Sequence, residues 1–397
     1  MTSLLHTRNA VALSFALNGF CFATMVSRLP DIRSGLELDN AALGLLLLAI
    51  SVGSVIALPL SGRLIDRFGA TWVTRLGAVL VVVGLSVGML GVVTDLLPLT
   101  AVGFFLDGVG IAVWDVSMNV EAAEVERRLE RTIMPRFHAG WSLGSFAGAA
   151  IGIPMAAVHA PLMLHVPGFA LLAGLATWRA AATYLPAREA HEERQVEPFS
   201  PWREPRTLAI GVMVLAFALT EGAANDWLAL ALIDGYDVRH WVGVTGFTVF
   251  VCSMMAGRLY GPVLLDRYGR APVLWASSAA AFVGILLVVF GAHVVLVGLG
   301  IVVWGLGASL GFPVGMSAAA DDPLRAARRV SAVSTIGYTA FLAGPPLLGL
   351  LADHVGTLET LLVIAALMIP AAATVFAARE RRPSPAEPDQ PVGRARL

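Results

Sequence analysis

Long apolar stretches, separated by short polar segments, run along almost the whole chain. Each is about 20 residues long, the length that a helix needs to cross the hydrocarbon core of a bilayer. Only helices or closed barrels satisfy every backbone group in lipid, and these runs are too long and continuous for barrel strands. The pattern predicts an all-α membrane protein with twelve transmembrane helices, at about 9–28, 40–61, 72–94, 97–122, 138–158, 162–184, 207–232, 241–262, 271–291, 294–317, 331–352 and 357–378.

The longest polar connection divides these predicted helices into two groups of six. It covers residues 185–206, is charged and contains prolines. We expect an N-terminal six-helix bundle over 1–184 and a C-terminal one over 207–378, joined by this cytoplasmic linker. The last segment, 379–397, is rich in proline and charge, and is predicted to be a disordered cytoplasmic tail.

The arginines indicate how the chain is oriented. With a cytoplasmic N-terminus, the cytoplasmic loops and tails hold 24 arginines, and the opposite loops hold only Arg28, Arg33 and Arg239. Such an excess of basic residues marks the cytoplasmic side. No cleavable signal peptide is apparent before the first span, so we expect that span to remain. The expected location is a bacterial plasma (inner) membrane, with both termini cytoplasmic.

Composition supports the membrane interpretation. Hydrophobic residues make up 57% of the chain and charged residues 14%, whereas soluble proteins are about 25% charged. A very large soluble core would not account for apolar runs that recur along the whole length. All 27 basic residues are arginine and the net charge is −1, so no nucleic acid partner is indicated. Cys21 and Cys252 lie in predicted spans as small apolar residues, and no metal or cofactor is expected.

The two halves of the chain resemble one another. The segment "LIDRFGATWV" (64–73) aligns with "LLDRYGRAPV" (264–273) at an offset of 200 residues. Four glycines of the first half align with glycines of the second at an offset of 197, which is unlike a chance recurrence in a glycine-rich chain. A repeat of two six-helix units is typical of secondary transporters with a central site. The glycine pairs are Gly108 and Gly305, Gly110 and Gly307, Gly140 and Gly337, and Gly152 and Gly349.

The segment "GRLIDRFGATWVTR" resembles the loop between helices 2 and 3 of the major facilitator superfamily, G-x-L-x-D-R-x-G. Its residues are Gly62, Leu64, Asp66, Arg67 and Gly69. Ala70 and Thr71 stand where the family often has basic residues. The second copy keeps Leu264, Asp266, Arg267 and Gly269, with Pro262 in place of the first glycine. The resemblance covers the whole chain and implies two bundles that alternate access to a central site.

A finer resemblance is to the MosC-like (YbjJ-like) group of this superfamily. It rests on "RLPDIRSGLELDNAALG", "DVSMNVEAAEVERR", "FHAGWSLGSFAGA" and "LTEGAANDWLALAL". The substrates of the group are poorly defined, and one member is associated with a sugar-like inositol derivative.

The loop motif predicts a latch that forms when the cytoplasmic side is closed. Gly69 and Gly269 allow a sharp chain reversal. Asp66 and Asp266 are expected to face the positive N-terminal end of a neighbouring helix. Arg67 and Arg267 are expected to pair with acids at the inner end of helix 4 or 10, among which Glu121 and Glu124 are candidates. The alternative is that the motif supplies only turn chemistry and cytoplasmic positive charge.

Ionisable and polar groups inside spans are candidates for a binding or proton site. In helix 4, Asp115 lies roughly 18 Å from Arg127, well inside the membrane. Asn119 shares its face, one turn away, a pairing that suits proton carriage or hydroxyl recognition. Asp107 lies deeper on the same helix, and Asn18 lies near the middle of helix 1. The alternatives are a structural carboxyl group for Asp115 and an interhelical hydrogen bond for Asn18.

Helix 5 carries His138 and Trp141 near its inner end. His138 titrates near neutral pH in ordinary surroundings, although a lone histidine is more often structural. Four glycines of this helix, spaced four residues apart, predict close contact with a neighbouring helix. Helix 5 lacks a clear copy of the Gly-Pro motif of antiporters, which weakens the hypothesis that the protein is a drug antiporter. The glycines are Gly140, Gly144, Gly148 and Gly152.

Helices 7, 10 and 11 supply the candidates of the second half. In "TEGAANDW", Glu221 lies near mid-membrane, Asn225 is predicted on the same face, and Asp226 follows. The alternative is a polar patch that permits a break in helix 7. Trp304 and Tyr338 are candidates for stacking on a sugar or ring, although aromatic residues in spans usually serve packing.

These features predict a monomeric secondary transporter rather than an enzyme. The expected cargo is a small polar organic solute, sugar-like in character, coupled to protons through Asp115 and Glu221. The alternative is a proton-driven efflux pump for hydrophobic compounds or drugs. A membrane sensor would need an extra domain that this chain lacks, and the sequence has no nucleotide-binding G-x-x-x-x-G-K-[ST] loop.

Overall fold

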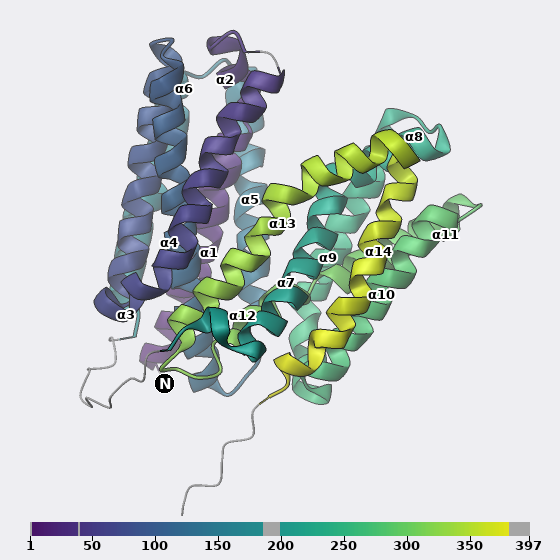
Figure 1. Ribbon diagram of the computed structural model, residues 1–397. Coiled ribbons are helices and arrows are strands. Elements are labelled where there is room, and N and C mark those ends of the chain that lie inside the picture. Colours follow the sequence, from purple (N-terminus) through teal and green to yellow (C-terminus); the bar gives the residue numbers. More distant parts are fainter. Residues whose placement is uncertain (1, 39, 186–198, 381–397) are drawn as a thin grey trace, which may run out of the picture.

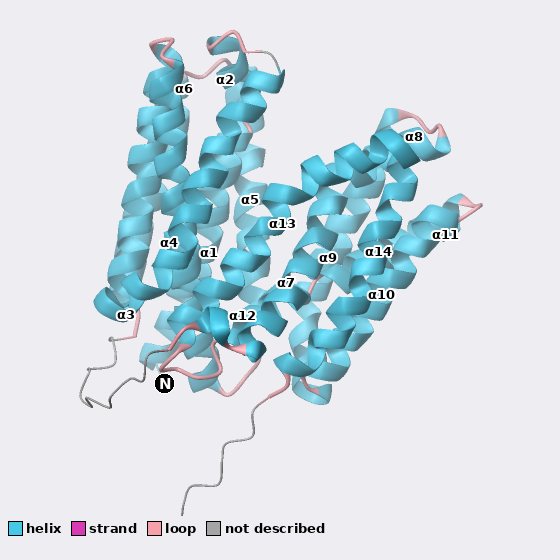
Figure 2. Ribbon diagram, viewed as in Figure 1, coloured by secondary structure: helices cyan, strands magenta, loops and turns pink. Residues whose placement is uncertain are grey.

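The computed structural model describes residues 2–38, 40–185 and 199–380, and within these ranges it contains helices and no strand (Figure 2). The first half comprises α1 (Thr2–Val26), α2 (Leu29–Gly35), α3 (Asn40–Val93), α4 (Leu97–Leu129), α5 (Met134–Ala157), α6 (Leu162–Ala180), η1 (Ala181–Thr183) and η2 (Pro201–Arg203). The second half comprises α7 (Pro205–Ala223), the π-helical turn η3 (Ala224–Leu228), α8 (Ala229–Tyr236), α9 (His240–Tyr268), α10 (Arg270–Phe290), α11 (Val294–Ala308), α12 (Gly311–Ala319), α13 (Ala326–Val355), α14 (Thr357–Thr374) and η4 (Val375–Ala378).

These helices make twelve membrane crossings. Within the described residues, nine helices are long and apolar enough to span a bilayer, or ten with the bent α13. At 54 residues, α3 would be about 80 Å long, and a bilayer core is only about 30 Å thick. Its break at Gly69 therefore makes it two crossings, and α5, with 24 residues, supplies the twelfth. The predicted twelve-helix fold is confirmed.

The break in α3 has the same geometry as the junction of α9 and α10. Gly69 has φ 79° and ψ 157°, and Gly269 has φ 80° and ψ 168°. A side chain is disfavoured at such positive φ values, so both copies of the loop motif depend on glycine for the same reversal. The predicted spans ended at 61 and 262, but helical structure continues to these glycines.

Helices within each bundle approach closely through small residues. The predicted close contact of α5 is with α1, because a Cβ atom added at Gly144 would clash with the backbone oxygen of Ala16. Gly148 similarly faces the backbone of Phe20. In the second bundle, α7 packs on α13 and α10 on α11. Close backbone contact of this kind is how helices associate in lipid, where no hydrophobic force holds them together.

The two bundles meet at one end of the molecule and diverge toward the other (Figure 1). We call the end that carries Gly69 and Gly269 the closed end, and the end that carries α2 and α8 the open end. Contacts between the bundles join α3 to α13, α5 to α9, and α12 to α4 and α5. The closed end is also the one predicted to be cytoplasmic. Residues 186–198 of the predicted linker and 381–397 of the predicted tail lie outside the described residues.

Replacing Gly69 by Ala should destabilise the protein by about 1–3 kcal/mol, because alanine would be held at a strained positive φ. The measurement is thermal unfolding of the purified protein in detergent. Gly168→Ala in α6 is the matched control, since nothing lies within 4 Å of an added Cβ atom there. An unchanged melting temperature for Gly69→Ala would contradict the prediction.

Candidate functional site

Arg258 of α9 lies where the two bundles meet. We call this junction, formed by α3, α4 and α5 of one bundle and α9, α12 and α13 of the other, the seam. Its side chain is buried, with 4% of the residue exposed. Its Nη2 donates to Glu221 Oε2 of α7 at 2.7 Å, and its Nη1 donates to Ser142 Oγ of α5 at 3.0 Å. Its Nε donates to the backbone oxygen of Ser309, between α11 and α12, at 3.3 Å. One guanidinium group thus joins both bundles.

Sequence reasoning placed Arg258 among the cytoplasmic loop arginines, and this was wrong. The residue lies ten positions before the end of α9 at Tyr268, which is about 15 Å along the helix axis. The signal that could have found it is that the predicted span 241–262 already contained it. The internal repeat aligns it with Leu58, so the charge belongs to one half of the molecule only.

Asp115, Asn119 and His138 form a hydrogen-bonded chain on the other side of the seam. Asn119 Nδ2 donates to Asp115 Oδ1 at 3.2 Å, as their predicted common face requires. Asn119 Oδ1 lies 3.2 Å from His138 Nε2 of α5. An amide oxygen only accepts, so in this arrangement the proton is on His138 Nε2. The chain connects a buried carboxyl group of α4 with a ring that faces the second bundle.

A row of aromatic rings continues from His138 into the C-terminal bundle. The ring of His138 meets Phe312 edge-on at 5.6 Å between centroids, and Phe312 meets Tyr338 at 6.0 Å. The side chain of Tyr338 interacts with that of Asp115. Its ring centroid lies 6.0 Å from that of Phe341. Tyr338 therefore lies where the polar chain and the aromatic row meet.

Two further predicted residues lie in the N-terminal bundle. Asn18 Oδ1 accepts a hydrogen bond of 3.0 Å from Trp141 Nε1, which matches the interhelical alternative that the sequence left open. Asp107 is buried, lies next to Cys21, and has no hydrogen-bond partner for either carboxyl oxygen among the described residues. It lies about 12 Å along α4 from Asp115, so it is separate from the chain at Asn119.

Three predicted site residues form no hydrogen bond or ion pair with Arg258 among the described residues. Asn225 and Asp226 are exposed, and neither contacts Arg258. They fall in the π-helical turn Ala224–Leu228, which interrupts the regular α-helix after Ala223. Trp304 is fully buried in the C-terminal bundle and packs edge-on against Phe250 at 5.3 Å. Within the described residues, no cluster of three or more His, Cys, Asp or Glu side chains could hold a metal.

Both copies of the loop motif contact the opposite bundle at the closed end. Asp66 Oδ2 accepts from Arg328 Nε at 2.5 Å, beside the start of α13, and Asp266 Oδ1 accepts from the backbone N–H of Thr132 at 3.1 Å, just before α5. A Cβ atom added at Gly62 would lie 2.7 Å from the backbone oxygen of Ala327, so this glycine permits the contact with α13.

The arginines of the motif do not pair as predicted. Arg67 and Arg267 stack over the rings of Phe68 and Tyr268, and neither has an acidic partner among the described residues. The candidate acids have nearer donors, because Glu124 pairs with Arg127 and Arg128 of its own helix. Glu121 is buried and accepts the backbone N–H of Leu185 at 2.7 Å.

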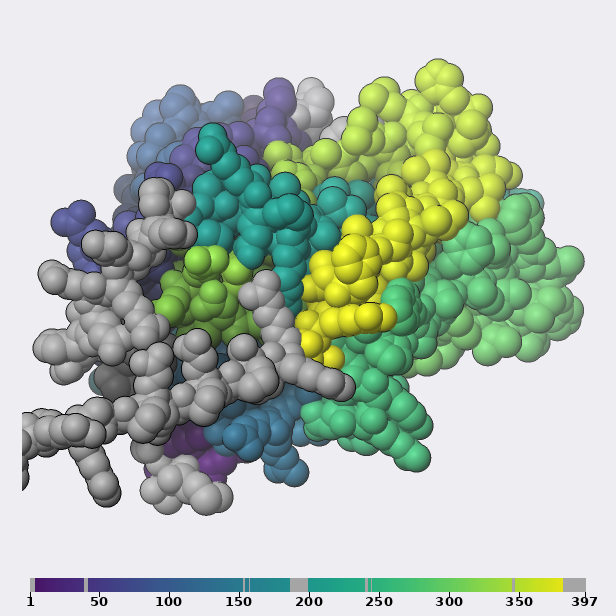
Figure 3. Space-filling model, turned by 60° about the horizontal axis from the view of Figure 1, so that its bottom comes forward, coloured from purple at the N-terminus to yellow at the C-terminus, as the bar shows by residue number. Residues whose placement is uncertain are grey.

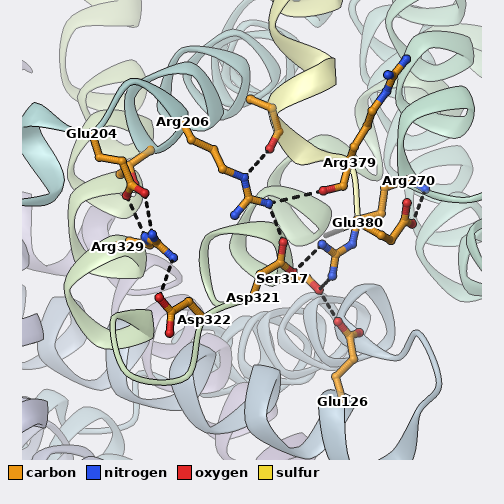
Figure 4. A network of polar contacts seen from close by, with 12 residues as sticks. Glu126, Glu204, Arg206, Arg270, Ser317, Asp321, Asp322, Arg329, Arg379 and Glu380 are labelled. Atoms are coloured by element: carbon orange, nitrogen blue, oxygen red, sulfur yellow. Dashed lines mark hydrogen bonds and ion pairs between the residues drawn. The ribbon is translucent and has the colours of Figure 1, made fainter. Parts of the chain in front are cut away.

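A polar network missed by sequence reasoning completes the closed end (Figure 4). Glu126 of α4 accepts the backbone N–H groups of Ile133 and Met134 at 2.8 and 2.7 Å, and it also accepts a hydrogen bond from Ser317 of α12. Asp321 pairs with Arg206 at 2.5 Å and with Arg270 at 2.7 Å. Arg329 is held between Glu204 and Asp322. The pairs Glu126–Ser317, Arg206–Asp321 and Arg329–Glu204 are more than a hundred residues apart in the sequence, so helical spacing gave no signal for them.

Comparison with known proteins places this architecture in a family. The chain matches the Major Facilitator Superfamily over residues 11–323 and 240–397. The chain belongs to the major facilitator superfamily. An uncharacterised transporter, y4wD, of Sinorhizobium fredii is 34% identical over 361 residues, 89% of this chain and 93% of that protein. The membrane protein MosC of Rhizobium meliloti is 28% identical over 384 residues, 96% of this chain and 92% of MosC.

The fold is also that of solved members of the superfamily. A structure of the E. coli fucose:proton symporter FucP has a TM-score of 0.78 at 15% sequence identity, covering 94% of this chain and 98% of FucP. A structure of FucP in the outward conformation has the same TM-score, covering 96% of this chain and all of that one. The resemblances to the superfamily and to MosC are confirmed.

The buried ion pair of this superfamily member predicts a strong energetic coupling. Glu221→Gln or Arg258→Gln alone should each cost about 3–5 kcal/mol, because the remaining charge stays buried without its partner. The double variant should cost clearly less than the sum. The free energy of unfolding in detergent is the measurement.

The partly exposed pair Glu124–Arg127 is the matched control for this cycle, and each of its single replacements should cost less than about 1 kcal/mol. Additive losses at Glu221 and Arg258 would contradict the coupling.

Proposed function

We propose that this protein is a proton-coupled secondary transporter that moves a small polar organic solute by alternating access. The observation that carries the proposal is Arg258, which joins Glu221 of one bundle to Ser142 of the other inside the membrane. A buried charge held between two bundles marks a site whose contacts must change when the bundles move.

The seam offers recognition groups suited to a hydroxylated solute. Ser142, Asn119 and His138 provide donors and acceptors from the N-terminal bundle, and Arg258 provides donors from the C-terminal one. The row from Phe312 to Phe341 adds ring faces on which a sugar can stack. The fold shared with a fucose:proton symporter supports a sugar-like solute.

Proton coupling is proposed to run through Asp115 and Glu221. Asn119 donates to Asp115 and also contacts His138 of α5. Arg258 donates to Glu221 and also to Ser142 of the opposite bundle. A solute that binds the Arg258 donors would compete with Glu221 for them, and protonation of Glu221 would release Arg258. Both carboxyl groups would thus link solute binding to the proton gradient.

The closed end is proposed to face the cytoplasm, with both termini on that side and the protein in a bacterial plasma membrane. The arginine excess supports this orientation, and it survives the reassignment of Arg258, because 23 arginines remain against three. The described arrangement would then be closed to the cytoplasm. The likeness to FucP in its outward conformation is consistent with it.

Efflux of hydrophobic compounds is the second candidate, favoured by the same aromatic row. The two functions differ in what they require of the polar chain. A polar solute needs Asn119 and His138, whereas an apolar cargo needs mainly the rings. A thermal-shift screen of the purified protein against sugars, polyols, amino acids and apolar drugs separates them, since binding to the folded state alone raises the melting temperature.

Replacing Asp115 by Asn should abolish solute uptake driven by a pH gradient, because an amide cannot bind and release a proton as a carboxyl group does. Uptake into proteoliposomes with and without an imposed gradient is the measurement, with a solute found in the thermal-shift screen. Asp95→Asn, at an exposed acid of the α3–α4 connection, is the control and should transport normally. Proton-dependent uptake that persists in Asp115→Asn would refute the assignment.

Removing the acid of the first loop motif should open the closed end more often. Ala327 is 6% exposed and contacts Gly62 across the seam, so a cysteine placed there reports opening through its rate of labelling. In a background without Cys21 and Cys252, Asp66→Asn should speed labelling of Ala327→Cys by about two- to fivefold, the effect of up to about 1 kcal/mol for a partly exposed ion pair. Glu124→Gln, which removes an acid paired only within its own helix, should leave the rate unchanged.

A further inference from the structure

A basic pocket lies at the closed end, on the outer edge of the seam. It has a volume of about 460 Å³ and is lined by four arginines, Arg8, Arg131, Arg136 and Arg267, together with Asp266. Leu5 and Val263 are among its apolar lining residues. Figure 3 views the molecule toward this end, where the α4–α5 connection (blue) lies beside the ends of α9 and α10 (green).

The arginines of this pocket differ from their neighbours in having no acidic partner. At the same end, Glu124 pairs with Arg127 and Arg128, and Asp66 pairs with Arg328. Among the described residues, none of the four pocket arginines forms an ion pair. Arg8 donates only to the side-chain oxygen of Asn9, and Arg267 stacks over Tyr268 at 5.2 Å. Four positive charges thus converge on a space that contains one carboxylate.

The single carboxylate is already engaged. Asp266 Oδ1 accepts the backbone N–H of Thr132, which joins α9 to the connection between α4 and α5. The contributed charges therefore favour an anion, and arginine pairs best with phosphate, to which it donates two parallel hydrogen bonds. A phosphate group that contacts Arg131 or Arg136 and also Arg267 would bridge the two bundles.

The surroundings of the pocket indicate that the phosphate belongs to a lipid. Val263 is 59% exposed, and the adjoining face of α9 carries Tyr260 and Tyr268, exposed by 72% and 54%. These two tyrosines line an apolar groove of about 500 Å³ between α9, α10 and α11. Arg267, which lines the basic pocket, stacks on Tyr268, which lines the groove. A headgroup and an acyl chain can therefore occupy the two spaces along one helix.

We propose that this pocket binds the phosphate headgroup of an anionic phospholipid and thereby stabilises the closed end. Basic pockets between helices at the cytoplasmic surface suit such headgroups. Because the arginines come from both bundles, separation of the bundles at this end divides the site. The site needs only the two bundles and the membrane, whatever solute the protein moves.

The test compares lipids that differ only in headgroup. Purified protein in neutral detergent receives short-chain phosphatidylglycerol, phosphatidylcholine with the same chains, or inorganic phosphate. Phosphatidylglycerol should raise the melting temperature by about 2 °C or more above phosphatidylcholine, and phosphate alone should not. It should also slow the labelling of Ala327→Cys at least about twofold, because the occupied site holds the bundles together.

Two variants decide whether the pocket is responsible. Arg131→Gln/Arg136→Gln changes two exposed side chains and should lose the phosphatidylglycerol shift while keeping the melting temperature in detergent alone. Arg63→Gln, at an exposed arginine outside the pocket, should keep the shift. If the first variant fails to fold, Arg8→Gln/Arg267→Gln replaces it.

Three outcomes would overturn the proposal: an equal shift with phosphatidylcholine, an equal shift with inorganic phosphate, or a shift that survives the loss of the pocket arginines. Equal loss in Arg63→Gln would also overturn it, since the effect would then be one of general charge.

Discussion

The burial of one guanidinium group constrains how the two bundles sit together. The guanidinium group of Arg258 is buried inside the membrane, where donors without acceptors are costly, and three of its N–H groups donate to α5, α7 and the α11–α12 junction. Neither bundle alone satisfies the group. The depth of α9, the position of Glu221 and the approach of α5 are therefore fixed together, and the hydrogen-bonded chain from Asp115 to His138 is held opposite them. Loss of any of these acceptors would therefore affect the packing of both bundles.

The closed end follows a related principle, because acids of one element satisfy N–H groups or arginines at the start of another. Asp66 meets Arg328 beside the first turn of α13, and Asp266 meets the N–H of Thr132 just before α5. Glu126 does the same for Ile133 and Met134. Negative charge is favoured at helix N-termini, so each acid stabilises the helix that it meets. The contacts of Asp66 and Asp266 also join the two bundles. The two loop motifs are thus equivalent in position and differ in the donor that they meet.

The sequence predicted what depends on local pattern and missed what depends on partners. Apolar length gave the twelve crossings, and the offset of the repeat gave Gly69 and Gly269 a common role. Helical spacing placed Asn119 beside Asp115 correctly. The sequence contains no local signature of the π-helical turn at Ala224–Leu228, which shifts the register of the helix beyond it. Arg67 stacks on the neighbouring ring of Phe68 rather than pairing with Glu121 or Glu124, and Arg329 meets Glu204, 125 residues away in the sequence.

The π-helical turn also affects how the two parts of the seventh crossing, α7 and α8, can move relative to each other. Its additional residue puts the helix beyond Leu228 out of phase by about 100° with the helix that carries Glu221. If this turn converted to an α-helical turn, α8 would rotate about its own axis while Glu221 remained beside Arg258. The π-helical turn therefore allows α8 to rotate independently of α7, which carries the ion pair.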